Sequence, residues 1–549
     1  MLKRKLTKLS AVILSAALVG TLLAGCGSSS SSTTTEQKVS YNLGADPQTI
    51  DPGLNNSTEG GIVIENAFEG LVDLDKNEKV IPGVAKSWDV SADKLTYTFH
   101  LRKDAKWSDG KPVKAKDFEF AWKRALAPDT ASDYAYQLFY LKNGEAYNGG
   151  KASKDDVGVK AVDDNTLKVE LQSPTPYFLA LTAFPTYMPL REDIVSKDNK
   201  GWATKKANYV SNGPFYMTDW KQKSTMTFKK NPNYWNKSTV KLDTLTYYML
   251  SQETSATAAF TSGQVDLNEI IPAVQKQSLI KKGTAKVYPY YGTYYFCFNV
   301  GDKDSANGAE VTKALKNEKV REALNLAIDR ESIVKDVTKG GEKPATSFVP
   351  SSITTANDSK KFKNKDYLPK KADVKKAKQL LAEAGYPDGK GFPTLQIMYN
   401  EGQNHQDIVQ AMQDMYKKNL GINVTLQSVE RKVQLDDLTK QQYQFCRTAW
   451  IADYNDPMTF LDMFVTGGGN NNPGYSNPQY DALIADAKAT ADGTKRTKDL
   501  HDAEDLLMKD LPIVPVYEYD LVVEQKPEVK GLHVSPLGYL YFNSVYIQK

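Results

Sequence analysis

The sequence predicts a protein of several domains that mixes α-helices with β-strands, in the α/β or α+β class. Three observations support this prediction. The chain has 549 residues, whereas a single domain typically has about 100–200. Some segments alternate apolar and polar residues, as strands do, and others repeat apolar residues every three or four positions, as helices do. We find no internal repeat and no linker in mid-chain, so sequence pattern alone does not place the domain boundaries.

Strands are predicted where apolar and polar residues alternate. Residues 95–101 read LTYTFHL, a pattern typical of a half-buried strand. The apolar positions of 167–171 continue the same pattern. Residues 215–217 and 225–228 are expected to form neighbouring strands of a meander around Trp220.

Helices are predicted where apolar residues recur with helical spacing. Asp373 is expected to cap a helix that has one apolar face and that Gly385 ends. Apolar residues between 320 and 328 predict a second helix. Those between 408 and 415 predict a third, followed by a strand over 422–426.

The first 25 residues have the pattern of a secretory signal peptide. Four basic residues precede an apolar run from Leu9 to Leu23. The run is short and rich in small residues, which argues against a membrane-spanning helix. We therefore exclude residues 1–25 from the predicted fold.

A cysteine follows the apolar run. The sequence Leu-Ala-Gly before Cys26 resembles the lipobox of bacterial lipoproteins, which implies a lipid on Cys26. The alternative is an ordinary signal peptide with a chance cysteine. Glycine, serines and threonines over 27–35 predict a flexible tether, and we assign residues 26–40 to the lipidated cysteine and its tether. A lipid and a tether predict a protein that is anchored to the extracellular face of the bacterial cytoplasmic membrane and does not span it.

The mature chain is formally neutral. Of the 70 Lys and Arg residues, four lie in the leader, which leaves 66 against 66 Asp and Glu residues. This balance gives no reason to expect nucleic acid or a strongly charged partner. The other cysteines, Cys297 and Cys446, stand among aromatic residues, and we expect buried free thiols rather than a disulfide.

The common catalytic and metal-binding motifs are absent from the sequence. There is no H-E-x-x-H, G-x-S-x-G or P-loop, and no G-x-G-x-x-G after a predicted strand. The four histidines are scattered, and no cysteine–histidine group has the spacing of a zinc site. The sequence therefore predicts neither an enzyme nor a metal site, and it implies no cofactor.

One stretch combines aromatic residues, acids and turn formers. Residues 450–457 read WIADYNDP, which predicts a loop that leaves a strand and places Asp453 beside aromatic side chains. Such an acid could hold a cation. It could equally be a solvated acid in a turn, and the pattern alone does not decide between these interpretations.

Six groups of residues match one protein family in order along the chain. They lie at 50–71, 97–118, 212–235, 320–330, 452–457 and 513–517. The most specific group contains YTFHLR at 97–102 and WSDGKPV at 107–113. Through these residues the chain resembles the oligopeptide-binding proteins of ABC transporters, in the peptide/nickel-binding family 5 of extracellular solute-binding proteins.

The resemblance implies a three-lobed α/β fold of the type II periplasmic-binding-protein class, with a hinge between lobes. It implies a monomer that holds an oligopeptide between its lobes and delivers it to the permease subunits of an ABC importer. The expected lobe boundaries are 41–68, 194–295 and 521–549 for lobe I, 69–193 for lobe II and 296–520 for lobe III.

The resemblance also implies roles for single residues. Asp453 takes the position of the acid that binds the peptide's α-ammonium group, a cation that is charged near neutral pH. His405 and Arg447 match residues that can meet a ligand carboxylate. Further expected ligand-binding residues are Trp450, Ala449 and Ile451 (the last two through their main chain), the cleft aromatics Tyr294, Tyr295 and Tyr519, and Asn56, Ser57 and Thr58 in a strand that pairs with the peptide. Arg431 departs from the family pattern, because a large aromatic residue is expected at that position.

Alternatives remain open at this point. Within the same fold, the chain could be a receptor for a signalling peptide or a carrier of nickel, haem or an oligosaccharide. Outside this fold, the chain could be a surface peptidase, although it lacks a nucleophile motif and a metal cluster. It could also be a chaperone, which saturable one-to-one binding of short peptides would contradict. The retained acid at 453 favours ligands with a free amine, and hence peptides.

Overall fold

The computed structural model describes residues 36–301, 308–356, 358–402 and 404–548. The predicted signal peptide and the predicted lipid anchor Cys26 lie outside the described residues. Strand β1 (Lys38–Asn42) begins inside the stretch 26–40 that we assigned to the tether. The tether prediction was therefore wrong for its last residues, because Lys38–Ser40 pair in register with Thr244–Thr246 of β10.

A large mixed sheet runs through the molecule. Its strands are ordered β15-β14-β16-β12-β17-β11-β1-β10-β9-β8, and β13 pairs with β17. Its other strands are β8 (Phe215–Lys221), β9 (Thr225–Lys230), β10 (Thr244–Tyr248), β11 (Leu267–Asn268), β12 (Ala285–Phe298), β13 (Lys343–Pro344), β14 (Leu395–Asn400), β15 (Val424–Val429), β16 (Phe445–Ile451) and β17 (Ile513–Gln525).

Two long strands, β12 and β17, join the two ends of this sheet. They pair with each other in antiparallel register, while β16 lies on the outer side of β12 and β11 on the outer side of β17. The pairing of β12 with β17 is irregular between Pro289 and Thr293. Such irregularities disturb the ladder and bend a strand.

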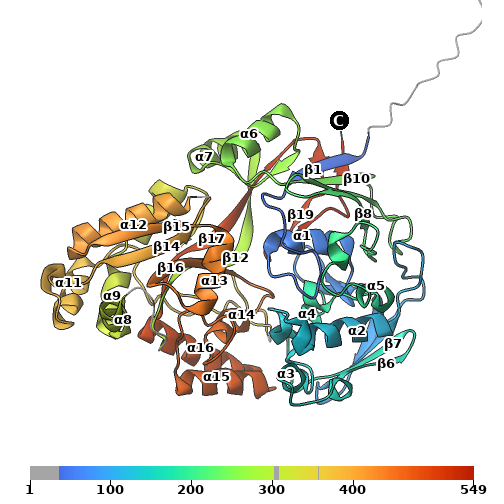
Figure 1. The fold of residues 1–549 in the computed structure, drawn as a ribbon, viewed down its shortest axis with the longest axis horizontal. Coiled ribbons are helices and arrows are strands. Elements are labelled where there is room, and N and C mark those ends of the chain that lie inside the picture. The colour runs from blue at the N-terminus through green and yellow to red at the C-terminus, as the bar shows by residue number, and fades with distance from the viewer. Residues whose placement is uncertain (1–35, 302–307, 357, 403, 549) are drawn as a thin grey trace, which may run out of the picture. The chain divides into compact units, whose positions relative to one another are not determined.

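Smaller sheets complete the β-structure. A four-stranded antiparallel sheet has the order β4-β5-β7-β6, and helix α2 crosses its face (Figure 1). The smaller sheets comprise β2 (Val72–Leu74) with β3 (Val80–Pro82), β4 (Ala85–Val90), β5 (Thr96–Leu101), β6 (Val159–Asp163) and β7 (Thr166–Glu170), β18 (Val529–Lys530) with β21 (Tyr546–Ile547), and β19 (His533–Val534) with β20 (Leu540–Tyr541).

Helices cover both ends of the large sheet (Figure 1). Helices α8, α9, α11 and α12 gather near β14 and β15, whereas α1 lies beside β8 and β20, and α2 beside β6 and β7. The α-helices are α1 (Thr58–Ala67), α2 (Ala115–Leu126), α3 (Gly144–Asn148), α4 (Phe178–Leu181), α5 (Glu192–Val195), α6 (Glu253–Ser262), α7 (Ala273–Lys282), α8 (Ala309–Lys316), α9 (Glu318–Leu326), α10 (Arg330–Ser332), α11 (Val374–Glu383), α12 (His405–Leu420), α13 (Arg431–Lys440), α14 (Met458–Leu461), α15 (Pro478–Ala489) and α16 (Gly493–Asp510).

The predicted elements are confirmed where apolar periodicity was clear. Strands β5 and β7 follow the alternating segments, and their residues alternate between buried and partly exposed. Helix α11 begins where the Asp373 side chain accepts a hydrogen bond from the backbone N–H of Lys376, and Gly385 follows its end with a φ of 97°. Only glycine adopts such a backbone conformation without strain.

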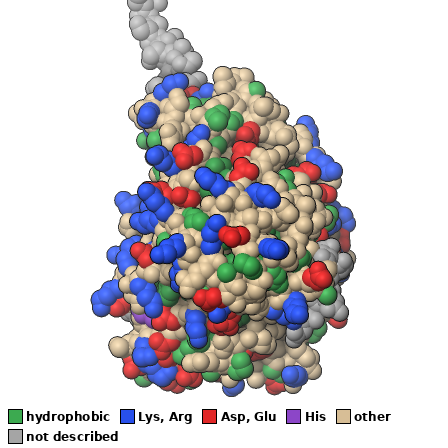
Figure 2. Space-filling model, turned by 90° about the vertical axis from the view of Figure 1, so that its left-hand side faces the viewer, with side chains coloured by type: hydrophobic (Ala, Val, Ile, Leu, Met, Phe, Trp, Pro, Cys, Tyr) green, Lys and Arg blue, Asp and Glu red, His purple; other side chains and the backbone are tan. Residues whose placement is uncertain are grey.

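Cys297 and Cys446 are free, buried thiols that face each other across the β12–β16 pair. The prediction of free thiols is confirmed. Within the described residues, no helix is both long enough and apolar enough to cross a bilayer. The face shown in Figure 2 carries Lys and Arg side chains interspersed with Asp and Glu, as a formally neutral mature chain leads us to expect.

Candidate binding site

Asp453 lies in the loop that follows β16, and the chain brings distant polar groups to it. Its carboxylate accepts a hydrogen bond from Nε2 of Gln137 at 2.7 Å and one from Oη of Tyr136 at 3.3 Å. Both donors belong to the short 3-10 helix Ala135–Leu138. The loop prediction for this segment is confirmed, and Asp453 itself is buried.

Burial dominates the electrostatics of this acid. Desolvation raises the pKa of Asp453 to about 7, and the hydrogen bonds from Tyr136 and Gln137 offset only part of that rise. Among the described residues no Lys, Arg or His forms an ion pair with it. A buried carboxylate without a cation is costly, so a cation placed at this position would be strongly favoured.

The rest of the WIADYNDP loop is held in place. Asp456 forms a buried ion pair with Arg496, with N–O distances of 2.7 and 2.9 Å. The Tyr454 ring stacks on that of Tyr177, with 4.4 Å between centroids. The ion pair therefore holds the loop from within the expected lobe III, and of the two aspartates in the loop only Asp453 lacks a basic partner among the described residues.

A second group of predicted residues gathers around Arg447. Its Nη1 donates to Oδ1 of Asn400 at 3.0 Å, and its Nη2 donates to Oη of Tyr519 at 3.1 Å. The guanidinium lies 4.6 Å from the ring centre of Tyr294, whose Oη is 3.2 Å from Nδ1 of His405. Burial, followed by the charge of Arg447, holds the pKa of His405 well below its usual range, so this histidine is neutral at neutral pH.

The edge of β16 is open between these two groups. Strand β14 pairs with β16 only at Phe445 and Cys446. Ala452 N–H donates to a carbonyl of the β12 side, and the Arg447 carbonyl accepts instead from the Gln434 side chain. Because backbone groups alternate sides along a strand, the N–H and C=O groups of Ala449 and Ile451 point to the open edge.

The remaining predicted residues divide into those that join the site and those that do not. Tyr294 joins Arg447, whereas Tyr295 points to the opposite side of β12 and packs on Phe348. This separation follows from the alternation of side chains along a strand. Trp450 lies near the end of β16, and its Nε1 donates to Oγ1 of Thr459, which also accepts from the Asp453 backbone N–H.

The segment 56–58 is not the strand that we expected. Ser57 is the N-cap of α1 and accepts a hydrogen bond from the backbone N–H of Gly60, and Thr58 is the first residue of that helix. Exposed Asn56 donates to Asp133 instead of pairing with a strand. Ser57 is a preferred capping residue. Its backbone is extended, as in a strand, but it leads directly into α1.

Several site residues were missed by sequence reasoning. Tyr136 and Gln137 stand more than 300 positions before Asp453, and no local pattern links them to it. Asn400 and Gln434 contact Arg447 from two further elements. Their positions at the end of β14 and in the first turn of α13 become informative only when the sheet order is known.

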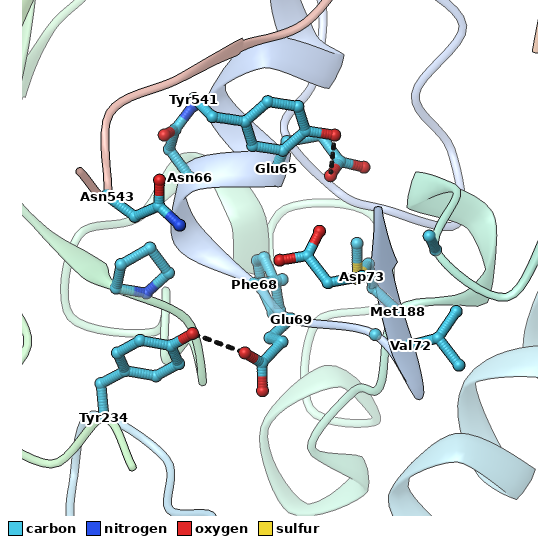
Figure 3. A pocket seen from close by; sticks show the side chains of 13 residues that line it. Glu65, Asn66, Phe68, Glu69, Val72, Asp73, Met188, Tyr234, Tyr541 and Asn543 are labelled. Carbon is cyan, nitrogen blue, oxygen red and sulfur yellow. Dashed lines mark hydrogen bonds between the residues drawn. The ribbon is translucent and has the colours of Figure 1, made fainter. Parts of the chain in front are cut away.

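A separate pocket lies beside α1 and is lined by acids (Figure 3). Glu69 accepts hydrogen bonds from Tyr234 Oη at 2.5 Å and from Trp235 Nε1 at 2.6 Å, and Glu65 accepts one from Tyr541 Oη at 3.2 Å. Burial raises the pKa of Glu69 to about 8. No group of three or more His, Cys, Asp or Glu in the described part of the chain is arranged to hold a metal ion.

Comparison with known proteins places the chain in a family. A model of the bacterial extracellular solute-binding proteins, family 5, matches residues 79–472. The oligopeptide-binding protein OppA of Bacillus subtilis is 40% identical over 520 residues, which is 93% of this chain and 92% of that protein.

Solved structures show the same fold. OppA of Listeria monocytogenes bound to peptide has a TM-score of 0.84 at 32% identity, covering 94% of this chain and 100% of that one. The Escherichia coli murein tripeptide binding protein MppA gives 0.84 at 33% identity, covering 94% and 99%. MppA in its unliganded open form gives only 0.67, at 32% identity with coverage of 93% and 97%.

These neighbours confirm the predicted three-lobed α/β fold of the type II periplasmic-binding-protein class. The family match covers most of the chain, and the relative aligns over nearly its whole length. This chain belongs to the bacterial extracellular solute-binding proteins of family 5.

Proposed function

We propose that this protein captures oligopeptides outside the cell, largely independently of their side chains, and delivers them to an ABC importer without catalysing a reaction. The observation that carries the proposal is buried Asp453 at one end of an open strand edge. Its carboxylate has neutral hydrogen-bond donors but no cation among the described residues. The α-ammonium group of a peptide would supply that cation.

The open edge of β16 would bind the peptide's main chain. An extended peptide beside Ala449 and Ile451 would add a strand to the sheet, a mode of binding that reads backbone groups rather than side chains. The segment from Arg447 to Asp453 is at most about 20 Å long at about 3.3 Å per residue. It therefore suits short peptides.

Arg447 would meet the other end of the ligand. With the peptide's amino terminus at Asp453, the ligand runs along β16 towards Arg447, so its carboxyl terminus arrives at the guanidinium. Because His405 is neutral, the positive charge at this end of the site belongs to Arg447. Opposite charges at the two ends of the site would fix the direction of the peptide.

Closure of the lobes would enclose the ligand. Gln137 and Tyr136 belong to the expected lobe II, and Asp453 to the expected lobe III, so their hydrogen bonds would form only when these lobes meet. The lower TM-score with an open form supports the interpretation that this conformation is closed. We place the hinge in β12 and β17, which contain the expected boundaries at 295/296 and 520/521.

A direct test is to identify the ligand. We expect native mass spectrometry of the protein, purified from a bacterial host without refolding, to show co-purified peptides with free amino termini. After mild removal of these peptides, calorimetry should show saturable binding of one trialanine per chain. Co-purified haem, nickel or oligosaccharide, with no peptide binding, would contradict the proposal. Cleavage of added peptides would contradict the non-catalytic role.

Anchoring completes the proposed function. The lipobox-like sequence before Cys26 supports a lipid that holds the protein at the extracellular face of the membrane, close to the permease subunits. Labelled palmitate should enter the wild-type chain in a bacterial host. The variant Cys26→Ser should remain unlabelled and be released into the medium, and equal labelling of the two chains would contradict the anchor.

A further inference from the structure

Arg431 lies at the edge of β16 beside Arg447. It is the first residue of α13, and it donates a hydrogen bond to Oε1 of Gln434 at 2.6 Å. The Nε2 of buried Gln434 donates in turn to the Arg447 carbonyl at 2.7 Å. The two arginines are thus linked through one glutamine, at the Arg447 end of the open strand edge.

Neither arginine has an anionic partner. Within the described residues, no Asp or Glu forms an ion pair with Arg431 or Arg447. The Nε of Arg447 is buried and donates no hydrogen bond, and its other nitrogens meet only neutral groups. The charge of Glu59 offsets part of the fall in the pKa of Arg431, but the two side chains form no ion pair.

Three buried arginines elsewhere in the chain have their donors satisfied by the protein itself. Arg124 pairs with Asp51 and Arg496 with Asp456. Arg321 has no carboxylate but donates to four backbone carbonyls. The Arg431–Arg447 pair differs from these three arginines, because it has donor groups without a hydrogen-bond partner beside the open edge of β16.

The surroundings of Arg431 favour an anion there. The residue is exposed to solvent, and yet enough protein surrounds its guanidinium that desolvation, followed by repulsion from Arg447, lowers its pKa to about 10. The guanidinium therefore contacts protein on one side and is open to a ligand on the other. The like charges of Arg431 and Arg447 repel each other, and a bound carboxylate relieves that repulsion.

We propose that Arg431 forms, together with Arg447, a subsite for a second carboxylate of the ligand, namely that of an acidic side chain at or next to the peptide's carboxyl terminus. The inference rests on the proposed function, because it uses the direction in which a peptide would lie along β16. Arg447 is the more deeply buried of the two and takes the α-carboxylate. Arg431 is the more exposed and has room for a side chain of variable position.

The subsite makes the protein selective within a general peptide-binding mode. Arginine forms two parallel hydrogen bonds with a carboxylate, and such charge-assisted bonds are roughly twice as strong as neutral ones. A glutamine side chain has the same shape as glutamate but no charge. We therefore expect peptides that end in glutamate to bind about ten- to a hundredfold more tightly than their glutamine counterparts.

The test uses the full chain after mild removal of bound ligand. Calorimetry compares two matched pairs of peptides, Ala-Ala-Glu with Ala-Ala-Gln and Ala-Glu-Ala with Ala-Gln-Ala. Ala-Ala-Ala is measured both with a free and with an amidated carboxyl terminus. Arg431→Gln removes the proposed charge. Lys432→Gln removes the charge of its exposed neighbour on the same helix and is the matched control. Arg431→Lys keeps a cation without the paired donors.

The inference expects a glutamate preference in the wild type and in Lys432→Gln, a reduced one in Arg431→Lys and none in Arg431→Gln. Ala-Ala-Ala lacks the second carboxylate, so Arg431→Gln should lose less affinity for Ala-Ala-Ala than for Ala-Ala-Glu. Its remaining affinity for Ala-Ala-Ala also shows that this variant is folded. Equal affinity for glutamate and glutamine peptides in the wild type overturns the inference and leaves the proposed function standing. If Arg431→Gln instead abolishes only the effect of amidation, Arg431 binds the α-carboxylate and the inference is wrong. Absence of binding by every peptide overturns the inference and the proposed function together.

Discussion

Gln137 donates a hydrogen bond to Asp453 over 2.7 Å, although 316 positions separate the two residues in the chain. The bond joins the short helix Ala135–Leu138, which packs on α2 and α3, to the loop after β16. It leaves the carboxylate with neutral partners only, in surroundings that raise its pKa to about 7. A cation bound beside this carboxylate would stabilise its ionised form.

Asp453→Asn should weaken peptide binding strongly. Loss of one partner of a buried charge pair costs about 2–5 kcal/mol, which corresponds to roughly a thirty- to several-thousandfold lower affinity. N-acetylation of the peptide removes the other partner and should cost the wild type a similar amount. Calorimetry on the four combinations gives the coupling energy. Strictly additive losses would show that Asp453 does not bind the amino terminus.

Peptide affinity should fall as the pH is lowered below about 7. The pKa of Asp453 is raised to about 7, so the unliganded carboxyl takes up a proton below that pH, whereas binding of an ammonium group requires the ionised form. The ionised fraction falls about tenfold for each pH unit below the pKa. We expect the Kd to be at least about ten times higher at pH 5.5 than at pH 7.2. Asp453→Asn should show no such change over this range.

Sequence pattern predicted the local elements well. The Asp373 cap, the apolar face of α11 and the alternation in β5 depend on neighbouring residues, and the structure reproduces all three. The segment 56–58 was misjudged because extended backbone before a helix N-cap looks like a strand end. Ser57 is a preferred capping residue, so the sequence also indicates a helix start at this position.

The sequence predicted some residues of the candidate site but not the residues that contact them from distant elements. Asp453 came from the motif at 450–457 and from family resemblance, whereas Arg447 came from the resemblance alone. Gln137, Asn400 and Gln434 depend on which elements lie next to β16, and this adjacency is set by packing over hundreds of residues. Tyr295 was assigned together with Tyr294, but side-chain alternation along β12 sends the two rings to opposite faces.

The protein should open when its ligand is removed. The conformation resembles a peptide-bound relative more than an open form, and the irregular pairing near Pro289 offers a place to bend. Small-angle scattering should therefore show a larger radius of gyration after ligand removal and a return to the smaller value with trialanine. Identical curves in both states would contradict hinge closure in β12 and β17.

A side chain at Gly292 should destabilise the fold. A Cβ at this position would lie 2.9 Å from the Trp450 carbonyl oxygen and would overlap Cδ1 of Ile451, so β12 and β16 would have to separate. Gly292→Ala should lower the free energy of unfolding by about 1–3 kcal/mol, as overpacking usually does, and should weaken peptide binding at the adjacent edge. Gly469→Ala, where no atom lies within 4 Å of the added carbon, is the control for denaturant unfolding, and equal stability of the two variants would contradict this account.

Glu69 should make the folded protein less stable as the pH rises. Burial raises its pKa to about 8 from 4.5, so the folded state holds a proton that the unfolded state has already lost between these values. The resulting stability is fully present below about pH 4.5 and is lost as the pH rises through 8. Glu69→Gln keeps an acceptor for Trp235 and removes the titration, so its melting temperature relative to wild type should increase steadily from pH 5 to pH 8.5. Glu192→Gln, an exposed change in α5, should show a constant difference over the same range. A constant difference for Glu69→Gln as well would mean that Glu69 is ionised in the folded protein throughout.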